Sequence, residues 1–185
     1  MSTQPYEGAV AAARSVLENV SADQMDRQTP CASWKVNDLV NHLVGGQHFF
    51  LAGLKGAPPA GADADYASGD FLAAFDEVTS EVSEGFSADG VMEQMFKLPF
   101  GEMPGSALAG LAATDTFVHG WDLAKATDQS TDLAPDLAAG LLQASKQAIQ
   151  ENFRGPEGAP FGPEQSAPDG ASNADQLAAF LGRKV

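Results

Sequence analysis

The chain has 185 residues, which is enough for one domain of ordinary size with its own hydrophobic core. Its hydrophobic fraction of 44% argues against disorder, and its formal charge of −15 disfavours binding to nucleic acid or to anionic membranes. Cys31 is the single cysteine, so an internal disulfide is excluded. The N-terminus lacks the pattern of a signal peptide, and no apolar run approaches the ~20 residues that a membrane span needs. We therefore expect a cytoplasmic protein.

Apolar residues at helical spacing predict the first two helices, in a chain whose frequent alanine favours helix over strand. The first predicted helix covers about residues 5–20, and a connection that contains Pro30 follows it. The second covers about 35–55, with Asp38 in its first turn, where a carboxylate suits the helix dipole. Residues 56–69 are rich in Gly, Pro and Asp and predict an exposed loop.

The rest of the chain continues the helical pattern. In chain order we predict a helix at 70–86, an irregular segment at 87–105, a helix at 106–126 with Ser106 as its N-cap, a helix at 133–152, an extended stretch at 153–171 and a short helix from Ser172 to Leu181. No strand is expected. The fold class is therefore all-α, a four-helix bundle with an added helix and a C-terminal tail. Residues 1–152 would form the metal-binding bundle, and residues 153–185 a tail whose short helix packs on it.

Polar residues interrupt the apolar arc of the helix predicted at 106–126. Asp115, His119 and Asp122 fall near the middle of that arc, where a lone charge costs several kcal/mol unless something compensates it. Asp115 and His119 are at i and i+4, so their side chains share one face and suit a divalent cation. The same spacing also fits a simple buried ion pair, and the spacing alone does not decide between the two.

A third ligand would come from a histidine on the helix predicted at 35–55. His42 lies at one edge of its apolar arc and His48 at the other. Gly45 and Gly46 beside His42 would leave room for an ion and a substrate. Periodicity does not choose between the two histidines.

Three stretches of the chain resemble a known family. The string TPCASWKVNDLVNHLVGG, with Trp34, Asp38 and His42, resembles the first metal-ligand motif of the DinB-like superfamily, and in particular of the actinobacterial mycothiol-dependent maleylpyruvate isomerase N-terminal family. The string LAGLAATDTFVHGWDLAKATDQ resembles the second motif of that family. The terminal ADQLAAFLGR is similar to the end of its short, single-domain members. The resemblance implies a DinB/YfiT-like four-helix bundle.

The resemblance also implies one divalent metal, usually zinc, held by two histidines and a carboxylate. Carried over position by position, the ligands are His42, Asp115 and His119, and His48 has no counterpart. The isomerase motif has Glu where this chain has Asp115, and a shorter side chain places the metal closer to its helix or binds it less tightly. The isomerase also carries a C-terminal domain that the residues after Asn152 cannot supply.

The leading functional hypothesis is a metal-dependent enzyme that uses a low-molecular-weight thiol such as mycothiol, in S-transfer to a small electrophile or in its isomerisation. The alternatives are a metal-dependent hydrolase, an iron(II) oxygenase with the same ligands, and a non-catalytic metal- or ligand-binding module. Nickel, manganese and iron remain open beside zinc. The expected partner is a small molecule, with no nucleic acid and no membrane, and the chain would be a monomer or a homodimer.

Four further residues are candidates for supporting the ligands or lining a pocket. Asp122 would accept a hydrogen bond from a ligand histidine or from backbone. Asp38 belongs to the first motif, and Glu102 and Met103 precede the ligand helix at the pocket mouth. Trp34, Trp121 and Cys31 are interpreted as core residues.

Overall fold

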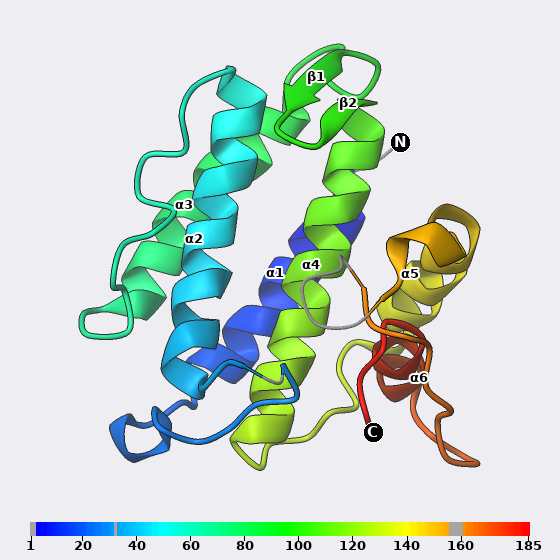
Figure 1. The fold of residues 1–185 in the computed structure, drawn as a ribbon. Helices are drawn as coiled ribbons and strands as arrows, with labels where there is room; N and C mark the ends of the chain where they lie inside the picture. Colours follow the sequence, from blue (N-terminus) through cyan, green and yellow to red (C-terminus); the bar gives the residue numbers. More distant parts are fainter. Residues whose placement is uncertain (1–2, 32, 156–160) are drawn as a thin grey trace.

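The computed structural model describes residues 3–31, 33–155 and 161–185. Across these residues the protein is mostly helical, with six α-helices and one small two-stranded sheet (Figure 1). The elements are α1 (Gln4–Leu17), α2 (Val36–Lys55), α3 (Phe71–Ser87), β1 (Met95–Leu98), β2 (Gly101–Pro104), α4 (Gly105–Ala126), α5 (Pro135–Ala148) and α6 (Asn173–Phe180), with short 3₁₀ turns at Ala22–Gln24 and Glu151–Phe153. None of the described helices is long and apolar enough to span a bilayer.

The sheet corrects the expectation of an all-α chain. Residues 87–105, predicted to be irregular, contain β1 and β2 as an antiparallel hairpin in which Phe96 faces Met103 and Leu98 faces Gly101. Phe96 and Leu98 are buried while the residues between and before them are exposed, as a half-buried strand requires. The predicted N-cap is also wrong, because α4 begins at Gly105 after Pro104 and Ser106 lies inside the helix.

Helices α1 to α4 surround a common core. Helix α1 packs against α3 and α4, and α2 packs against the same two helices. Helices α2 and α4 run in opposite directions, with the hairpin at one end of the pair (Figure 1). Helix α1 approaches α4 closely at Gly120, where an added Cβ would lie 3.0 Å from the Cα of Ala13. This close approach requires glycine at position 120.

A buried chain of hydrogen bonds crosses three of these helices. The hydroxyl of Tyr6 in α1 donates to Oε1 of Gln47 in α2 at 2.7 Å. Nε2 of Gln47 donates to the hydroxyl of Thr116 in α4 at 2.9 Å. All three residues are buried. The chain of bonds therefore fixes the position of α2 along α4.

The C-terminal part of the chain packs on the side of α4 and α5. Helix α6 begins as predicted, with the Ser172 hydroxyl accepting a hydrogen bond from the Asp175 amide at 3.1 Å. Helix α5 ends at Ala148, earlier than predicted, and a 3₁₀ turn follows. The stretch predicted as extended includes residues 156–160, which lie outside the described residues. The proposed division of the chain after residue 152 stays a prediction.

Candidate metal centre

Helices α2 and α4 bring His42, Asp115 and His119 together. One donor atom from each of the three lies within 4.8 Å of the others. Nε2 of His42 is 3.5 Å from Oδ2 of Asp115, and Nε2 of His119 is 3.6 Å from Oδ1 of the same carboxylate. The two imidazole rings meet edge to face with centroids 4.5 Å apart. We call these three residues the open triad, for the exposure described next.

The open triad is accessible from one side. The side chains of His42 and Asp115 are 30% and 27% exposed, whereas that of His119 is 10% exposed. Gly46, one turn after His42, leaves space here, because an added Cβ would lie 3.7 Å from Asp115 Oδ2 and 3.9 Å from His42 Nε2. Gly45 does not have this role, since its Cβ would meet the carbonyl oxygen of Ala62 at 2.2 Å.

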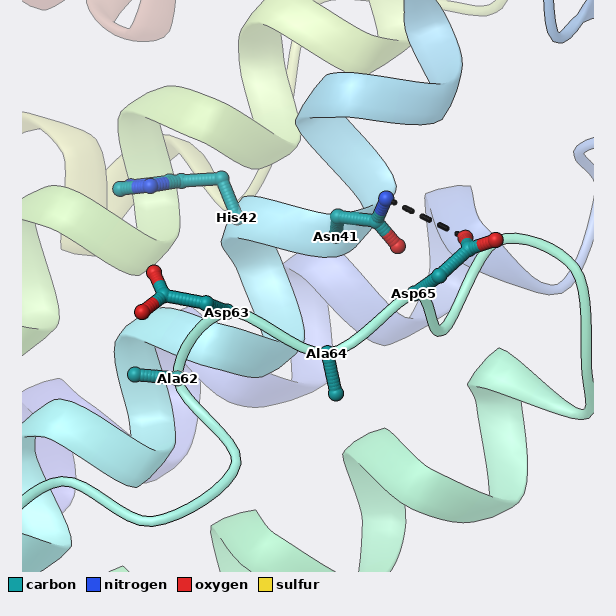
Figure 2. Close-up of a pocket in the computed structure, with 6 residues that line it drawn as sticks. All are labelled: Asn41, His42, Ala62, Asp63, Ala64 and Asp65. Carbon is teal, nitrogen blue, oxygen red and sulfur yellow. Dashed lines mark hydrogen bonds between the residues drawn. The ribbon is translucent and has the colours of Figure 1, made fainter.

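A pocket of about 280 Å³ adjoins His42 (Figure 2). It lies between α2 and the loop that follows it, and its lining consists of Asn41, His42, Ala62, Asp63, Ala64 and Asp65. The carboxylate of Asp63 projects to the same side as the His42 ring. Asn41 holds the loop in place, because its Oδ1 accepts hydrogen bonds from the amides of Tyr66 and Ala67 at 2.7 and 2.8 Å. The pocket is therefore acidic and its loop is anchored to α2.

One buried polar atom of the open triad lacks a hydrogen-bond partner among the described residues. Nε2 of His42 is buried and makes no hydrogen bond with any group in the described part of the chain. Burial opposes ionisation of Asp115, but the interactions of its carboxylate with His119 and His42 outweigh it and hold the pKa of this carboxyl below its ordinary value. An ionised carboxylate thus faces two imidazole nitrogens, one of them without a partner.

A second group of possible metal donors shares His119. Nδ1 of His119 lies 3.0 Å from Oδ2 of Asp122, and Sγ of Cys31 lies 3.2 Å from the same oxygen. We call Cys31, His119 and Asp122 the closed group, because the side chain of Arg183 already places a positive charge against it. The Arg183 guanidinium donates to both carboxylate oxygens of Asp122, the shortest bond being 2.9 Å, and lies 3.7 Å from the Cys31 sulfur.

The charges of the closed group compensate each other. Burial alone would raise the pKa of Asp122, but Arg183 and the hydrogen bond from His119 lower it to about 2. Burial and the Asp122 carboxylate raise the pKa of Cys31 to about 12. Cys31 is therefore a protonated thiol, which is a poor metal ligand. The closed group needs no metal to balance its charge.

Trp34 has contacts beyond the core. It was interpreted as a core residue and does pack against the core, but it is only partly buried, and its ring also packs on both histidines of the open triad. Its centroid is 4.6 Å from that of His42 and 5.5 Å from that of His119. Its position in the first motif, eight residues before His42, could have indicated this contact with the histidines.

The other candidates lie outside the open triad. His48 stacks on Tyr66 at 5.7 Å and joins neither donor group of the described residues. The exposed Asp38 carboxylate accepts a hydrogen bond from the Lys35 amide at 2.9 Å, so it caps α2 and is not placed in a pocket. Glu102 and Met103 belong to β2, where Glu102 is exposed and Met103 packs on the core. Asp122 contacts His119, which agrees with the predicted alternative in which it bonds to a ligand histidine and not to backbone.

Comparison with known proteins identifies the family of this chain. Residues 6–124 match the model of the mycothiol maleylpyruvate isomerase N-terminal domain. Two relatives from Mycobacterium tuberculosis, uncharacterized protein MT0763 of strain CDC 1551 / Oshkosh and uncharacterized protein Rv0738 of strain ATCC 25618 / H37Rv, are each 44% identical over 182 residues, which is 97% of this chain and 96% of theirs. No solved structure matches the chain. The matched segment contains the whole of the open triad and of the closed group, and the chain belongs to the mycothiol maleylpyruvate isomerase N-terminal domain family.

Proposed function

We propose that the open triad binds one divalent metal ion and that the chain is a metal-dependent enzyme acting with a low-molecular-weight thiol. The observation that carries the metal is the buried Nε2 of His42, which has no hydrogen-bond partner in the described part of the chain. An unpaired buried polar atom costs ~1–3 kcal/mol, and coordination to a cation removes that cost. The carboxylate of Asp115 lies 3.5 Å from this atom, and the donor atom of His119 lies within 4.8 Å of both residues.

The donor set of the open triad suits zinc. Two imidazole nitrogens and one carboxylate oxygen form a set that zinc binds in catalytic sites, although nickel, manganese and iron accept the same donors. Asp115 supplies the negative charge, since its pKa is held below the ordinary value. No fourth His, Cys, Asp or Glu of the described residues joins the group. This favours a site with an exchangeable position over a purely structural one.

Family membership supports a thiol as the second component. When bound, the cation would favour the thiolate form of a thiol such as mycothiol at neutral pH. Gly46 leaves space beside the triad, and the pocket that adjoins His42 gives a small molecule access to it. Trp34 covers the two histidines and holds their rings in place. The reaction would be S-transfer to a small electrophile or its thiol-assisted isomerisation.

Matched histidine variants test the metal site. Protein purified without added metal and then reconstituted with zinc, nickel, manganese or iron should contain one ion per chain by elemental analysis. His42→Ala should lose the ion, whereas His48→Ala, which removes a histidine from the same helix, should keep it. Metal-free wild-type protein after all four reconstitutions would overturn the proposal, and so would loss of the ion in His48→Ala alone.

Cobalt substitution tests the thiol. The Co(II)-loaded protein titrated with a small thiol should show a new sulfur-to-metal charge-transfer band, because the thiol would enter the exchangeable position. Metal binding with an unchanged spectrum at saturating thiol would overturn the thiol-dependent activity and leave a metal-binding module.

A further inference from the structure

The C-terminal segment of the chain, residues 173–185, attaches to the same part of α4 that carries His119. The indole Nε1 of Trp121 donates to Oδ1 of Asp175 at 2.9 Å. Arg183 binds Asp122 one residue further along α4. Two consecutive residues of α4, two and three positions after His119, are thus held by this segment.

Arg183 is held firmly in this position. Its side chain is 14% exposed, and its guanidinium makes three bonds to the Asp122 carboxylate, two from Nε at 3.2 and 3.3 Å and one from Nη2 at 2.9 Å. Nη1 donates to the carbonyl oxygen of Leu181 at 3.1 Å. A planar guanidinium that contacts both oxygens of one carboxylate fixes the orientation of that carboxylate.

The orientation of Asp122 in turn fixes His119. Oδ2 of Asp122 lies 3.0 Å from Nδ1 of His119, and an ionised carboxylate can only accept the bond, so Nδ1 carries the hydrogen. The lone pair of His119 is then on Nε2, the atom that faces Asp115 in the open triad. A fixed tautomer and ring orientation are what a ligand histidine needs from its outer partner.

We infer that Arg183 is a positioning residue of the metal site, and that docking of residues 173–185 is coupled to metal binding. The inference rests on the proposed metal function of the open triad. Coupling between two binding events is reciprocal, so a bound metal stabilises the docked segment to the same extent as the docked segment strengthens metal binding. The C-terminal segment is then a component of the site and contributes more than general stability.

The test compares two arginine variants. Arg183→Gln removes the guanidinium from Asp122. Arg14→Gln is the matched control, because Arg14 also forms a two-bond contact with a carboxylate, that of Asp76 at 2.7 and 2.9 Å, but between α1 and α3. Zinc affinity measured by competition with a chelator should fall about 10- to 100-fold in Arg183→Gln, the range for loss of an outer partner, and stay unchanged in Arg14→Gln. The absorption spectrum of the Co(II) form should change only in Arg183→Gln.

Hydrogen exchange of wild-type protein gives a readout that does not depend on how well the variants fold. Amides of residues 173–185 should exchange more slowly when zinc is added, whereas in His42→Ala zinc should have no effect on them. Wild-type protein that binds no metal overturns the proposed function itself. Wild-type protein that binds zinc without slower exchange in this segment, or Arg183→Gln with wild-type affinity and Co(II) spectrum, overturns the inference and leaves the metal site in place.

Discussion

The two donor groups on either side of His119 are similar in composition and different in charge. Each combines this histidine with one carboxylate and one further donor. In the closed group the carboxylate is fully buried and paired with Arg183. In the open triad the carboxylate is part-exposed, and a buried nitrogen of His42 lacks a partner. A cluster of metal-donor residues is therefore a candidate metal site only where no side chain already supplies the positive charge.

The largest expected difference between the two groups is in how much the free energy of unfolding falls when the carboxylate of each group is removed. Asp122→Leu leaves Arg183 buried without its carboxylate and should lower the free energy of unfolding by about 3–5 kcal/mol. Asp115→Leu removes a part-exposed carboxylate and should cost at most about 1 kcal/mol in the absence of metal. Urea unfolding in the presence of a chelator measures both values. Equal losses would contradict the distinction between a carboxylate that is paired with a buried arginine and one that is not.

The reactivity of Cys31 reports the charge state of the closed group. With its pKa raised to about 12, the thiolate fraction at pH 8 should be about a thousandfold below that of an ordinary cysteine. Alkylation by iodoacetamide should be slow in proportion, and faster in Asp122→Asn, which removes the neighbouring negative charge. Mass spectrometry of the modified chain gives the rates. A fast reaction at pH 8 would mean that Cys31 is a thiolate and that the closed group can take a metal.

Acid should weaken the closed group over a defined range of pH. The pKa of Asp122 in the folded chain is about 2, below the value near 3.9 of an unfolded aspartate, so folding favours its ionised form. The resulting contribution of about 2–3 kcal/mol is present above pH 4 and is lost as the pH falls towards 2. The stability of wild type relative to Asp122→Asn should fall by about 2 kcal/mol between pH 5 and 2, as measured by urea unfolding. A constant difference over that range would show that Arg183 does not hold the carboxylate ionised.

The smallest expected effect is that of a methyl group added beside the open triad at Gly46. Gly46→Ala should stabilise α2 by about 0.5–1 kcal/mol without loss of zinc affinity, since its Cβ meets nothing closer than 3.7 Å. Gly45→Ala is the control one residue earlier and should be destabilising, because its Cβ would meet the Ala62 carbonyl. Thermal melting and zinc titration of both variants measure this. Destabilisation by Gly46→Ala would show that the space beside the triad is already filled.

The sequence predicted the helical elements well and the hairpin not at all. Helical periodicity over many residues is a strong signal, whereas β1 and β2 have only four residues each and contain Pro104. Their pairing depends on burial of Phe96 and Leu98 against α2 and α4, which no local pattern reports.

The candidate site was predictable in part. The spacing of Asp115 and His119 within an apolar arc placed both on one face of α4. His42 and His48 could not be separated by periodicity, because they lie at opposite edges of the arc, and the loop that carries Tyr66 onto His48 distinguishes them. Arg183 was missed because it lies 61 residues from Asp122 and its contact exists only after α6 has docked. The similarity of ADQLAAFLGR, which ends in Arg183, to the ends of short family members could have drawn attention to this residue.

The hydrogen bonds from Tyr6 to Gln47 and on to Thr116 limit how far α2 can shift along α4, the two helices that carry the open triad. Thr116 follows Asp115 directly, and Gln47 follows Gly46, so the chain of bonds lies beside the open triad. A shift of α2 along α4 by one helical turn, about 5.4 Å, would leave these buried groups unpaired, at ~1–3 kcal/mol each. The distance between His42 and Asp115 is therefore set before any ion arrives, and little reorganisation energy would be required for an ion to enter.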